Sequence, residues 1–154
     1  MSGLKIKPPK KPRRPSAKFL ARKAEQEAIR RETPPAEGGV RIYLDDERSP
    51  PEGWTLVKSV TALMTMLCDL EPGRLERLSL DWHLGSGVTT GHDAVERILR
   101  LMLEEPERFA SLKSVTCHSS DRSEAIMMAR KLEDPLSDEW VGIPLYRVGI
   151  GQPD

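Results

Sequence analysis

Acidic residues directly follow two apolar segments in this chain of 154 residues. Asp45, Asp46 and Glu47 come after the run VRIYL, and Asp81 ends the run RLSLD. If the two segments are neighbouring strands, three or four carboxylates share one pocket, where their charges repel unless a cation joins them. Mg²⁺ prefers carboxylate and phosphate oxygens as ligands. The spacing therefore predicts a Mg²⁺ site formed by Asp45, Asp46 and Asp81, although the first two acids could instead end a strand and make turn bonds.

Histidines and serines occur in the same kind of polar loop. His83, His92 and His118 are the three histidines of the chain. Because imidazole titrates near neutral pH, a histidine beside a metal-bound phosphate can act as a general acid or base. Ser119 and Ser120 follow His118 at the predicted start of a helix, where they can cap the helix, bind an anion, or do both. The residues expected to carry out catalysis are Asp81, His118, Ser119 and His83.

Strand-like and helix-like segments alternate from Val40 onward. Strands are expected at 40–44, 54–59, 77–81, 113–117 and 143–148, and helices at 60–70, 92–104 and 121–132. Such alternation is typical of an α/β fold with an open parallel sheet and helices on both faces. In these sheets ligands bind beyond the carboxyl ends of the strands, which is where the polar loops DDER, DWHLGSG and HSSDR lie.

The formal net charge of zero hides a strong asymmetry. Residues 1–32 contain 11 Lys and Arg against 3 Asp and Glu, a net charge of +8, and the rest of the chain carries −8. We expect residues 1–38 to form a basic, mostly disordered arm with a polar helix over 16–32. Proline and glycine then mark the boundary to a domain over 39–150, which a short tail over 151–154 follows. The charge of the arm suits a nucleic acid or an acidic protein.

Length and hydropathy limit the remaining classes. A chain of 154 residues accommodates one domain rather than two. No apolar run approaches the ~18 residues of a membrane span, and the N-terminal segment lacks the apolar core of a secretory signal. We therefore expect a cytoplasmic protein without a membrane partner. Cys68 and Cys117 have no metal-binding spacing, and we expect both to be buried core residues rather than a disulfide.

Three segments resemble a known family. In order, LDDERSPPEGW, LSLDWHLGSGVTTGHDA and VTCHSSDRSEAI are similar to the cyclic-phosphate processing receiver-like family, a divergent branch of response-regulator receiver domains. The resemblance covers roughly Val40–Val148. It implies a flavodoxin- or receiver-like sheet of five strands. Only about ten residues join the first two predicted strands, so a reduced number of helices is expected.

The resemblance also implies roles for the acids and the histidine. Asp45 and Asp46 match the acidic metal pocket of receivers, and Asp81 matches their phosphoacceptor position. His118 and Ser119 match the His-Ser pair that follows the fourth strand in the family.

The stretch after Asp81 both follows and departs from the family pattern. Thr90 and Gly91 match the helix-start motif, but the usual Asp-His-Asp-Leu-Gly reads Asp-Trp-His-Leu-Gly here, so a second acid is absent. Trp82 could stack on a base, although core packing is the commoner fate of tryptophan. The residues expected to bind substrate are Arg48, Thr90, Gly91 and Trp82.

The family name implies work on 2′,3′-cyclic or similar phosphate ends, often in RNA repair or in conflict settings that include phage. We expect Mg²⁺-dependent processing or binding of the phosphate ends of RNA or nucleotides, and leave open whether the protein is a phosphoesterase-type enzyme. The alternative is a non-catalytic module that binds protein or nucleic acid, which the absent acid favours. A phosphoaccepting receiver is a third hypothesis. The fifth strand argues against it, because Arg147 is the sole candidate there for a receiver's lysine.

Overall fold

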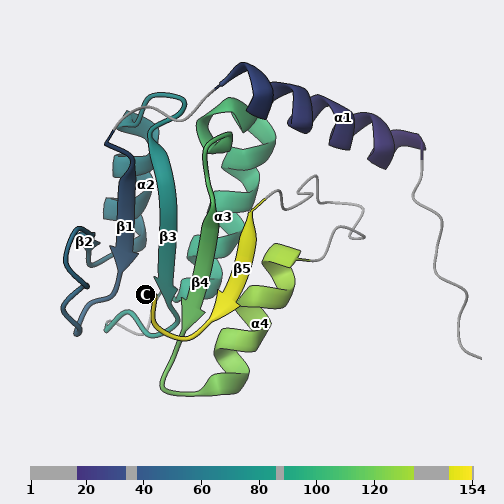
Figure 1. The fold of residues 1–154 in the computed structure, drawn as a ribbon. Coiled ribbons are helices and arrows are strands. Elements are labelled where there is room, and N and C mark those ends of the chain that lie inside the picture. Colours follow the sequence, from purple (N-terminus) through teal and green to yellow (C-terminus); the bar gives the residue numbers. More distant parts are fainter. Residues whose placement is uncertain (1–16, 34–37, 86–88, 134–145, 154) are drawn as a thin grey trace, which may run out of the picture.

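Five parallel strands form one sheet in the order β2-β1-β3-β4-β5 (Figure 1). The computed structural model describes residues 17–33, 38–85, 89–133 and 146–153. Its strands are β1 (Val40–Leu44), β2 (Thr55–Val57), β3 (Leu75–Asp81), β4 (Ser114–His118) and β5 (Arg147–Ile150). This order is that of flavodoxin-like sheets. The expected open, receiver-like sheet of five parallel strands is therefore confirmed.

The helices lie between the strands, as the alternating pattern predicts. They are α1 (Ala17–Glu32), α2 (Val60–Asp69), α3 (Gly91–Glu104), the short 3₁₀ helix η1 (Pro106–Phe109) and α4 (Arg122–Glu133). Capping groups fix where they begin. Before α2, the Ser59 hydroxyl accepts a hydrogen bond from the Ala62 N–H, and before α3 the Thr90 N–H donates to Asp93.

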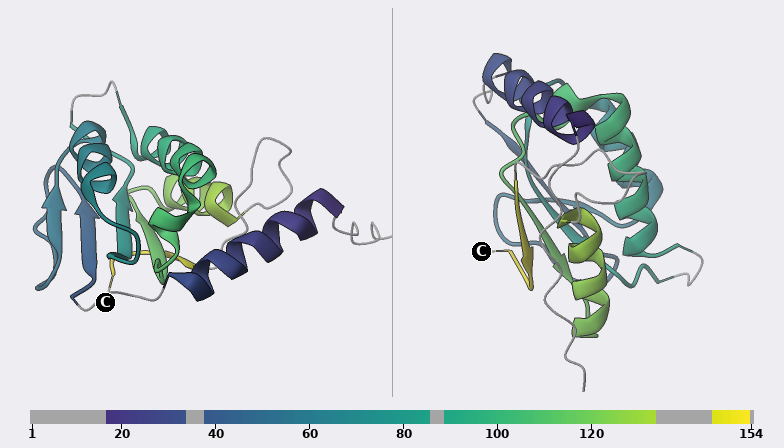
Figure 2. Two further views of the ribbon diagram at one scale, coloured as in Figure 1. Left: turned by 90° about the horizontal axis from the view of Figure 1, so that it is seen from above. Right: turned by 90° about the vertical axis from the view of Figure 1, so that its right-hand side faces the viewer.

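The three helices that connect strands cover a single face of the sheet. Viewed along the sheet edge, α2, α3 and α4 lie on one side of the strands (Figure 2). The connections β2–α2–β3, β3–α3–β4 and β4–α4–β5 all progress in the same direction, and right-handed crossovers then place their helices on the same face. The β1–β2 connection runs the other way and contains no helix. The expected helices on both faces are thus corrected to one covered face.

The other face, which no described helix covers, we call the open face. Because side chains alternate along a strand, it receives every second residue. Its members are Arg41 and Tyr43 of β1, Arg77 and Ser79 of β3, Ser114 and Thr116 of β4, and Arg147 and Gly149 of β5. The covered face receives the apolar residues between them, such as Ile42, Leu44, Leu78, Leu80, Val115 and Cys117, which join the core. Cys117 is buried as expected, but Cys68 is exposed on α2, which corrects its predicted burial.

α1 lies across the amino-terminal end of the sheet, away from the carboxyl ends of the strands (Figure 1). Arg30 of α1 donates to the carbonyl oxygen of Leu112 at 2.9 Å, which fastens the helix to the domain. α1 occupies the range in which the sequence predicts a helix. The preceding residues, for which we predict disorder, lie outside the described part of the chain. None of the described helices has the length and apolar composition of a membrane span.

The chain after β5 packs on the sheet. The Gly151 N–H donates to the carbonyl of Cys117 at 2.9 Å. Gln152 then reaches β1, where its Oε1 accepts a hydrogen bond from the Tyr43 hydroxyl at 2.7 Å. The segment predicted as a short tail therefore contacts the carboxyl ends of the strands. Of the strand predicted at 143–148, residues before 146 lie outside the described ranges.

Candidate functional site

The carboxyl ends of three strands bring two carboxylates and an imidazole together. Asp45 follows β1, and Asp81 and His118 are register partners at the ends of β3 and β4. His118 Nδ1 lies 3.8 Å from Asp45 Oδ2 and 3.6 Å from Asp81 Oδ1. The ligand atoms of the three buried residues all lie within 4.8 Å of one another, so they could hold a metal ion. We call these residues the Asp-Asp-His group.

Burial and like charge shift the titration of this group. The pKa of the Asp81 carboxyl is raised to about 6, first because burial strips water from the carboxylate and then because Asp45 and Asp46 are negative nearby. Burial lowers the pKa of the His118 imidazole to about 4, so the ring is neutral at pH 7. A neutral ring cannot balance the carboxylates. A cation between these side chains would relieve their repulsion.

The side chain of His118 is buried, and its ring nitrogens form no hydrogen bond with the described residues. The residue is 2% exposed, and neither Nδ1 nor Nε2 has a hydrogen-bond partner among the described residues. An unsatisfied buried polar atom costs about 1–3 kcal/mol, so packing alone does not account for a histidine at this position. A ligand that bonds to the ring nitrogens would remove this cost. The unpartnered imidazole therefore fits a metal ion or a phosphate group at the site.

The two carboxylate oxygens of Asp45 have different partners. Oδ1 accepts hydrogen bonds from the N–H groups of Glu47 and Arg48, at 2.9 and 3.0 Å, and so forms the turn after β1. Oδ2 faces His118 and accepts from the Tyr43 hydroxyl at 3.4 Å. Asp45 thus ends the strand with turn bonds and also joins the acidic cluster, and its role as a Mg²⁺ ligand stays a prediction.

Asp46 does not belong to the Asp-Asp-His group. Both acids lie beyond the end of β1, and Asp46 stands in the bend that follows Asp45. The Asp46 carboxylate lies instead against the loop after β3, where a Cβ added at Gly85 would be 2.4 Å from Asp46 Oδ2. Its charge still helps to raise the pKa of Asp81.

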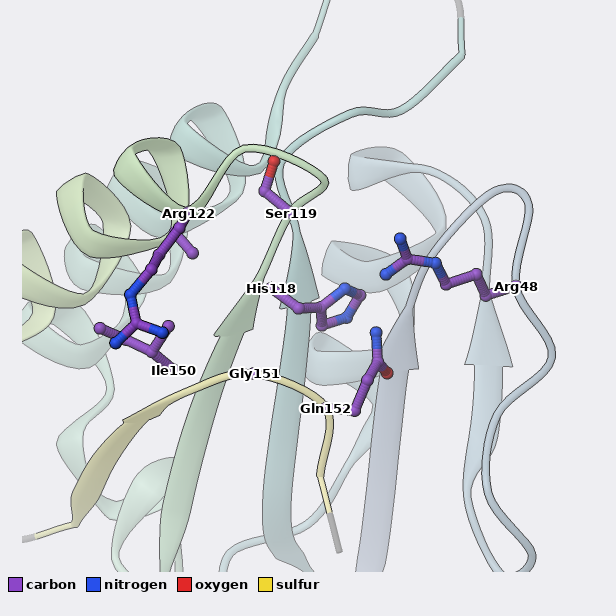
Figure 3. A pocket seen from close by; sticks show the side chains of 8 residues that line it. Arg48, His118, Ser119, Arg122, Ile150, Gly151 and Gln152 are labelled. Atoms are coloured by element: carbon purple, nitrogen blue, oxygen red, sulfur yellow. The ribbon is translucent and has the colours of Figure 1, made fainter.

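A cavity of about 270 Å³ opens beside His118 (Figure 3). Arg48, from the loop after β1, and Arg122, from the first turn of α4, lie on opposite sides of it (Figure 3). Ser119 and Gln152 add polar groups to its lining. Guanidinium groups bind phosphate oxygens through charge-assisted hydrogen bonds. The cavity therefore suits an anion with several oxygens.

His83 and Ser119 bond to Glu124 rather than to the Asp-Asp-His group. Glu124 Oε1 lies 2.9 Å from His83 Nε2 and accepts the Ser119 hydroxyl at 3.4 Å. The Ser119 Oγ in turn accepts from the Asp121 N–H at 3.2 Å, a bond of the capping kind. The His83 side chain is 58% exposed. The catalytic roles expected of His83 and Ser119 stay predictions.

Of the four residues expected to bind substrate, one lines the cavity and three lie outside its lining. Arg48 lines the cavity, whereas Thr90, Gly91 and Trp82 do not. Thr90 begins α3, and Trp82 packs against the apolar core. A Cβ added at Gly91 would lie 2.1 Å from the backbone carbonyl oxygen of Asp81, so glycine is required where α3 approaches β3. Gly91 thus positions Asp81, and direct substrate binding by these three residues stays a prediction.

Several residues at the site escape sequence reasoning. Gln152 follows β5 at the same edge of the sheet, so the rule that selected Asp81 and His118 could have found it. Arg122 directly follows the HSSD run, where a cation beside a predicted anion site was a usable signal. In the sequence Tyr43 resembles an ordinary strand residue, and Glu124 resembles a residue on a solvated helix face. No sequence signal therefore indicates that either residue lies at the site.

Residues 40–134 match the family described as the cyclic-phosphate processing receiver domain. The matched range runs from β1 through α4 and includes the Asp-Asp-His group. No curated protein and no solved structure matches the chain. Because the match covers more than half of the sequence, and the strand order agrees with a receiver fold, the chain belongs to the cyclic-phosphate processing receiver domain family.

Proposed function

We propose that this protein opens 2′,3′-cyclic phosphate ends of RNA or nucleotides in a Mg²⁺-dependent hydrolysis. One observation carries the proposal: the buried Asp-Asp-His group adjoins a cavity with an arginine on each side. The carboxylates could hold a cation, the arginines could hold phosphate oxygens, and the imidazole between them is neutral. These are the three capacities that the hydrolysis of a phosphodiester requires.

Asp45 and Asp81 are the residues that would hold Mg²⁺. Their carboxylates supply the oxygen ligands that the ion prefers, and they approach one another within 4.8 Å. When bound there, Mg²⁺ would neutralise phosphate charge and polarise the phosphorus–oxygen bonds. Its positive charge would also lower the pKa of Asp81 from about 6, which keeps the carboxylate ionised at neutral pH.

Arg48 and Arg122 would orient the phosphate. Their side chains reach the cavity from the β1 loop and from α4, with His118 between them (Figure 3). Two cations on opposite sides fix the direction of a phosphate group as well as its position. The Arg48 backbone is tied to the acidic cluster, since its N–H donates to Asp45 Oδ1.

His118 is the group suited to proton transfer. With a pKa near 4 its imidazole is unprotonated at pH 7 and can accept a proton from the attacking water. A new oxygen–phosphorus bond forms, the bond from phosphorus to the 2′ or 3′ oxygen breaks, and the departing oxygen takes the proton back from the imidazolium. The products are a phosphomonoester and a free hydroxyl.

Conversion of a defined RNA tests the proposal. The full chain is incubated with an oligonucleotide that ends in a 2′,3′-cyclic phosphate, with Mg²⁺ or with EDTA, and the products are separated by chromatography and weighed by mass spectrometry. We expect a gain of one water that requires Mg²⁺ and disappears in Asp81→Asn and His118→Ala. Arg130→Gln, an exposed cation at the other end of α4, is the matched control. Salt-sensitive RNA binding without any turnover would instead support the non-catalytic alternative.

A further inference from the structure

Three arginines stand in one row across the open face. Arg41 on β1 is the register partner of Arg77 on β3, which pairs with Ser114 on β4, and Ser114 pairs with Arg147 on β5. Directly aligned residues of neighbouring strands lie on the same side of a sheet. The row thus runs perpendicular to the strands and spans four of the five. We call these four residues the arginine row.

The arginine row is accessible and has spare positive charge. The Arg41 and Arg77 side chains are 36% and 35% exposed, and Arg147 is exposed. Glu76 offsets part of the charge, because it accepts hydrogen bonds from Arg41 and lies 3.8 Å from Arg77. One carboxylate among three guanidinium groups leaves a net positive row.

The row is aligned with the candidate site along the strands. Arg77 and Asp81 share the open face of β3 and are four residues apart, which is about 13 Å at the rise of an extended strand. In the row between them, Tyr43 and Ser79 are buried, whereas Thr116 on β4 and Gly149 on β5 are small, uncharged and half-buried. An extended ligand could therefore cross the sheet over β4 and β5, from the site to the arginines.

Beyond the arginine row the charge continues onto α1. The row is near the amino-terminal ends of the strands, and α1 crosses that end of the sheet (Figures 1 and 2). α1 exposes Lys18, Lys23 and Arg31 together with Glu25 and Glu32, and Arg30 fastens it there through the Leu112 carbonyl. The exposed cations of α1 therefore outnumber its exposed acids and extend the positive charge of the arginine row.

We propose that the open face binds the RNA strand that precedes a phosphate end held in the cavity. This inference rests on the proposed function and deepens it, because it makes an oligonucleotide rather than a mononucleotide the preferred substrate. Phosphates at regular spacing match cations placed at the cavity, at the arginine row and on α1. An acidic protein segment would need no fixed phosphate in the cavity, so the alignment with Arg48 and Arg122 favours a nucleic acid.

Binding by oligonucleotides of two lengths tests the inference. The full chain is titrated into a fluorescent octanucleotide with a 2′,3′-cyclic phosphate end, at several salt concentrations, and a nucleoside 2′,3′-cyclic phosphate is the competitor. The variant Arg77→Gln/Arg147→Gln should weaken octanucleotide binding and reduce the slope of log K against log salt by about 1.4, since each phosphate contact on a single strand contributes about 0.7. The affinity of the mononucleotide should stay unchanged.

The control is Arg97→Gln/Arg100→Gln, which removes two exposed cations from α3 on the covered side. Equal losses in both double variants, or no loss in Arg77→Gln/Arg147→Gln, would overturn the inference. Turnover separates it from the proposed function. If the mononucleotide is hydrolysed but the arginine row has no effect on octanucleotide binding, the inference about the open face fails and the proposed function stands. If octanucleotide binding needs the row but nothing is hydrolysed, the proposed function alone fails.

Discussion

Tyr43 and His118 stack face to face across an intervening strand. Their ring centroids are 5.2 Å apart and the ring planes differ by 17°. Tyr43 lies on β1 and His118 on β4, with β3 between them. The β3 residue beside Tyr43 is Ser79, which is small and fully buried, so the two rings can meet above it. The stack fixes the imidazole of the Asp-Asp-His group in place of the hydrogen bonds that His118 lacks.

Two substitutions of Tyr43 should distinguish the contribution of its ring to stability from that of its hydroxyl. Tyr43→Phe retains the stack and should cost about 1 kcal/mol of unfolding free energy, because the bonds to Gln152 and Asp45 are lost. Tyr43→Ala should cost about 3–5 kcal/mol by opening a cavity in the buried cluster. Urea denaturation measures both. RNA conversion should persist in Tyr43→Phe, and an equal loss of turnover in the two variants would show that the hydroxyl, not the ring, matters.

The contribution of Asp81 to the stability of the metal-free protein should be smaller at neutral pH than at acid pH. Its folded pKa, about 6, lies above the ordinary value of 3.8, so the folded state holds the proton more tightly. The resulting stabilisation is complete below about pH 4 and is lost as the pH rises through about 6. Asp81→Asn removes this dependence, and at pH 8 it should be more stable than the natural chain by about 3 kcal/mol.

The comparison is made by urea denaturation in EDTA at pH 4 and pH 8. His118 acts in the opposite sense, because its lowered pKa of about 4 removes stability as the pH falls below its ordinary value of 6.5. The histidine is present in both proteins, so the difference between them isolates Asp81. Equal stability of the two chains at pH 8 would contradict a strained carboxylate at this position.

Metal binding should distinguish Asp45 from Asp46. Mg²⁺ at 100 times its dissociation constant should add about 2.7 kcal/mol to the stability of the natural chain. Asp45→Asn should abolish this gain, since Asp45 belongs to the Asp-Asp-His group, whereas Asp46→Asn should retain most of it. Thermal melting with Mg²⁺ and with EDTA measures the effect. If Asp46→Asn lost the gain and Asp45→Asn kept it, the assignment of ligands would be reversed.

The adjacent acids show where sequence reasoning succeeds and where it stops. The sequence locates the strand that ends before Asp45, because a short apolar run meets a polar turn there. The alternation of strand side chains does not separate the two acids, because both lie beyond the end of β1 and Asp46 is in a bend. The sequence allows turn bonds for either acid, but which of the two makes them depends on the local backbone path.

The histidines show the same limit. His83 and His118 both occur in loops at the carboxyl edge, which the sequence predicts correctly. His118 ends a buried strand and joins the acids, whereas His83 extends outward to Glu124. The difference arises because His118 is the last residue of β4, in register with Asp81, whereas His83 lies two residues beyond the end of β3. One-sided helix coverage could have been derived from handedness, once the order of the strands in the sheet was assumed.

Gly91 should not tolerate a side chain. In Gly91→Ala the new Cβ would lie 2.1 Å from the Asp81 carbonyl oxygen, and backbone cannot move away as a flexible side chain can. We expect a loss of about 1–3 kcal/mol in unfolding free energy, together with weaker metal binding at Asp81. Gly149→Ala is the control, because its Cβ would meet Thr116 at an ordinary 3.5 Å. Similar stability changes in the two variants would remove the argument for close approach.

Arg122 should contribute to phosphate binding and little to stability. It is exposed on the first turn of α4 and faces Arg48 across the cavity (Figure 3). Arg122→Gln should therefore weaken the binding of a nucleoside 2′,3′-cyclic phosphate by about tenfold, as expected when one charged hydrogen bond of about 1.5–3 kcal/mol is lost. Its melting temperature should match that of Arg130→Gln, which removes a cation from the last turn of the same helix. Calorimetric titration measures the affinity. Of these two arginines, only Arg122 lines the cavity. If Arg130→Gln weakened binding equally, the loss of affinity would come from the change in net charge.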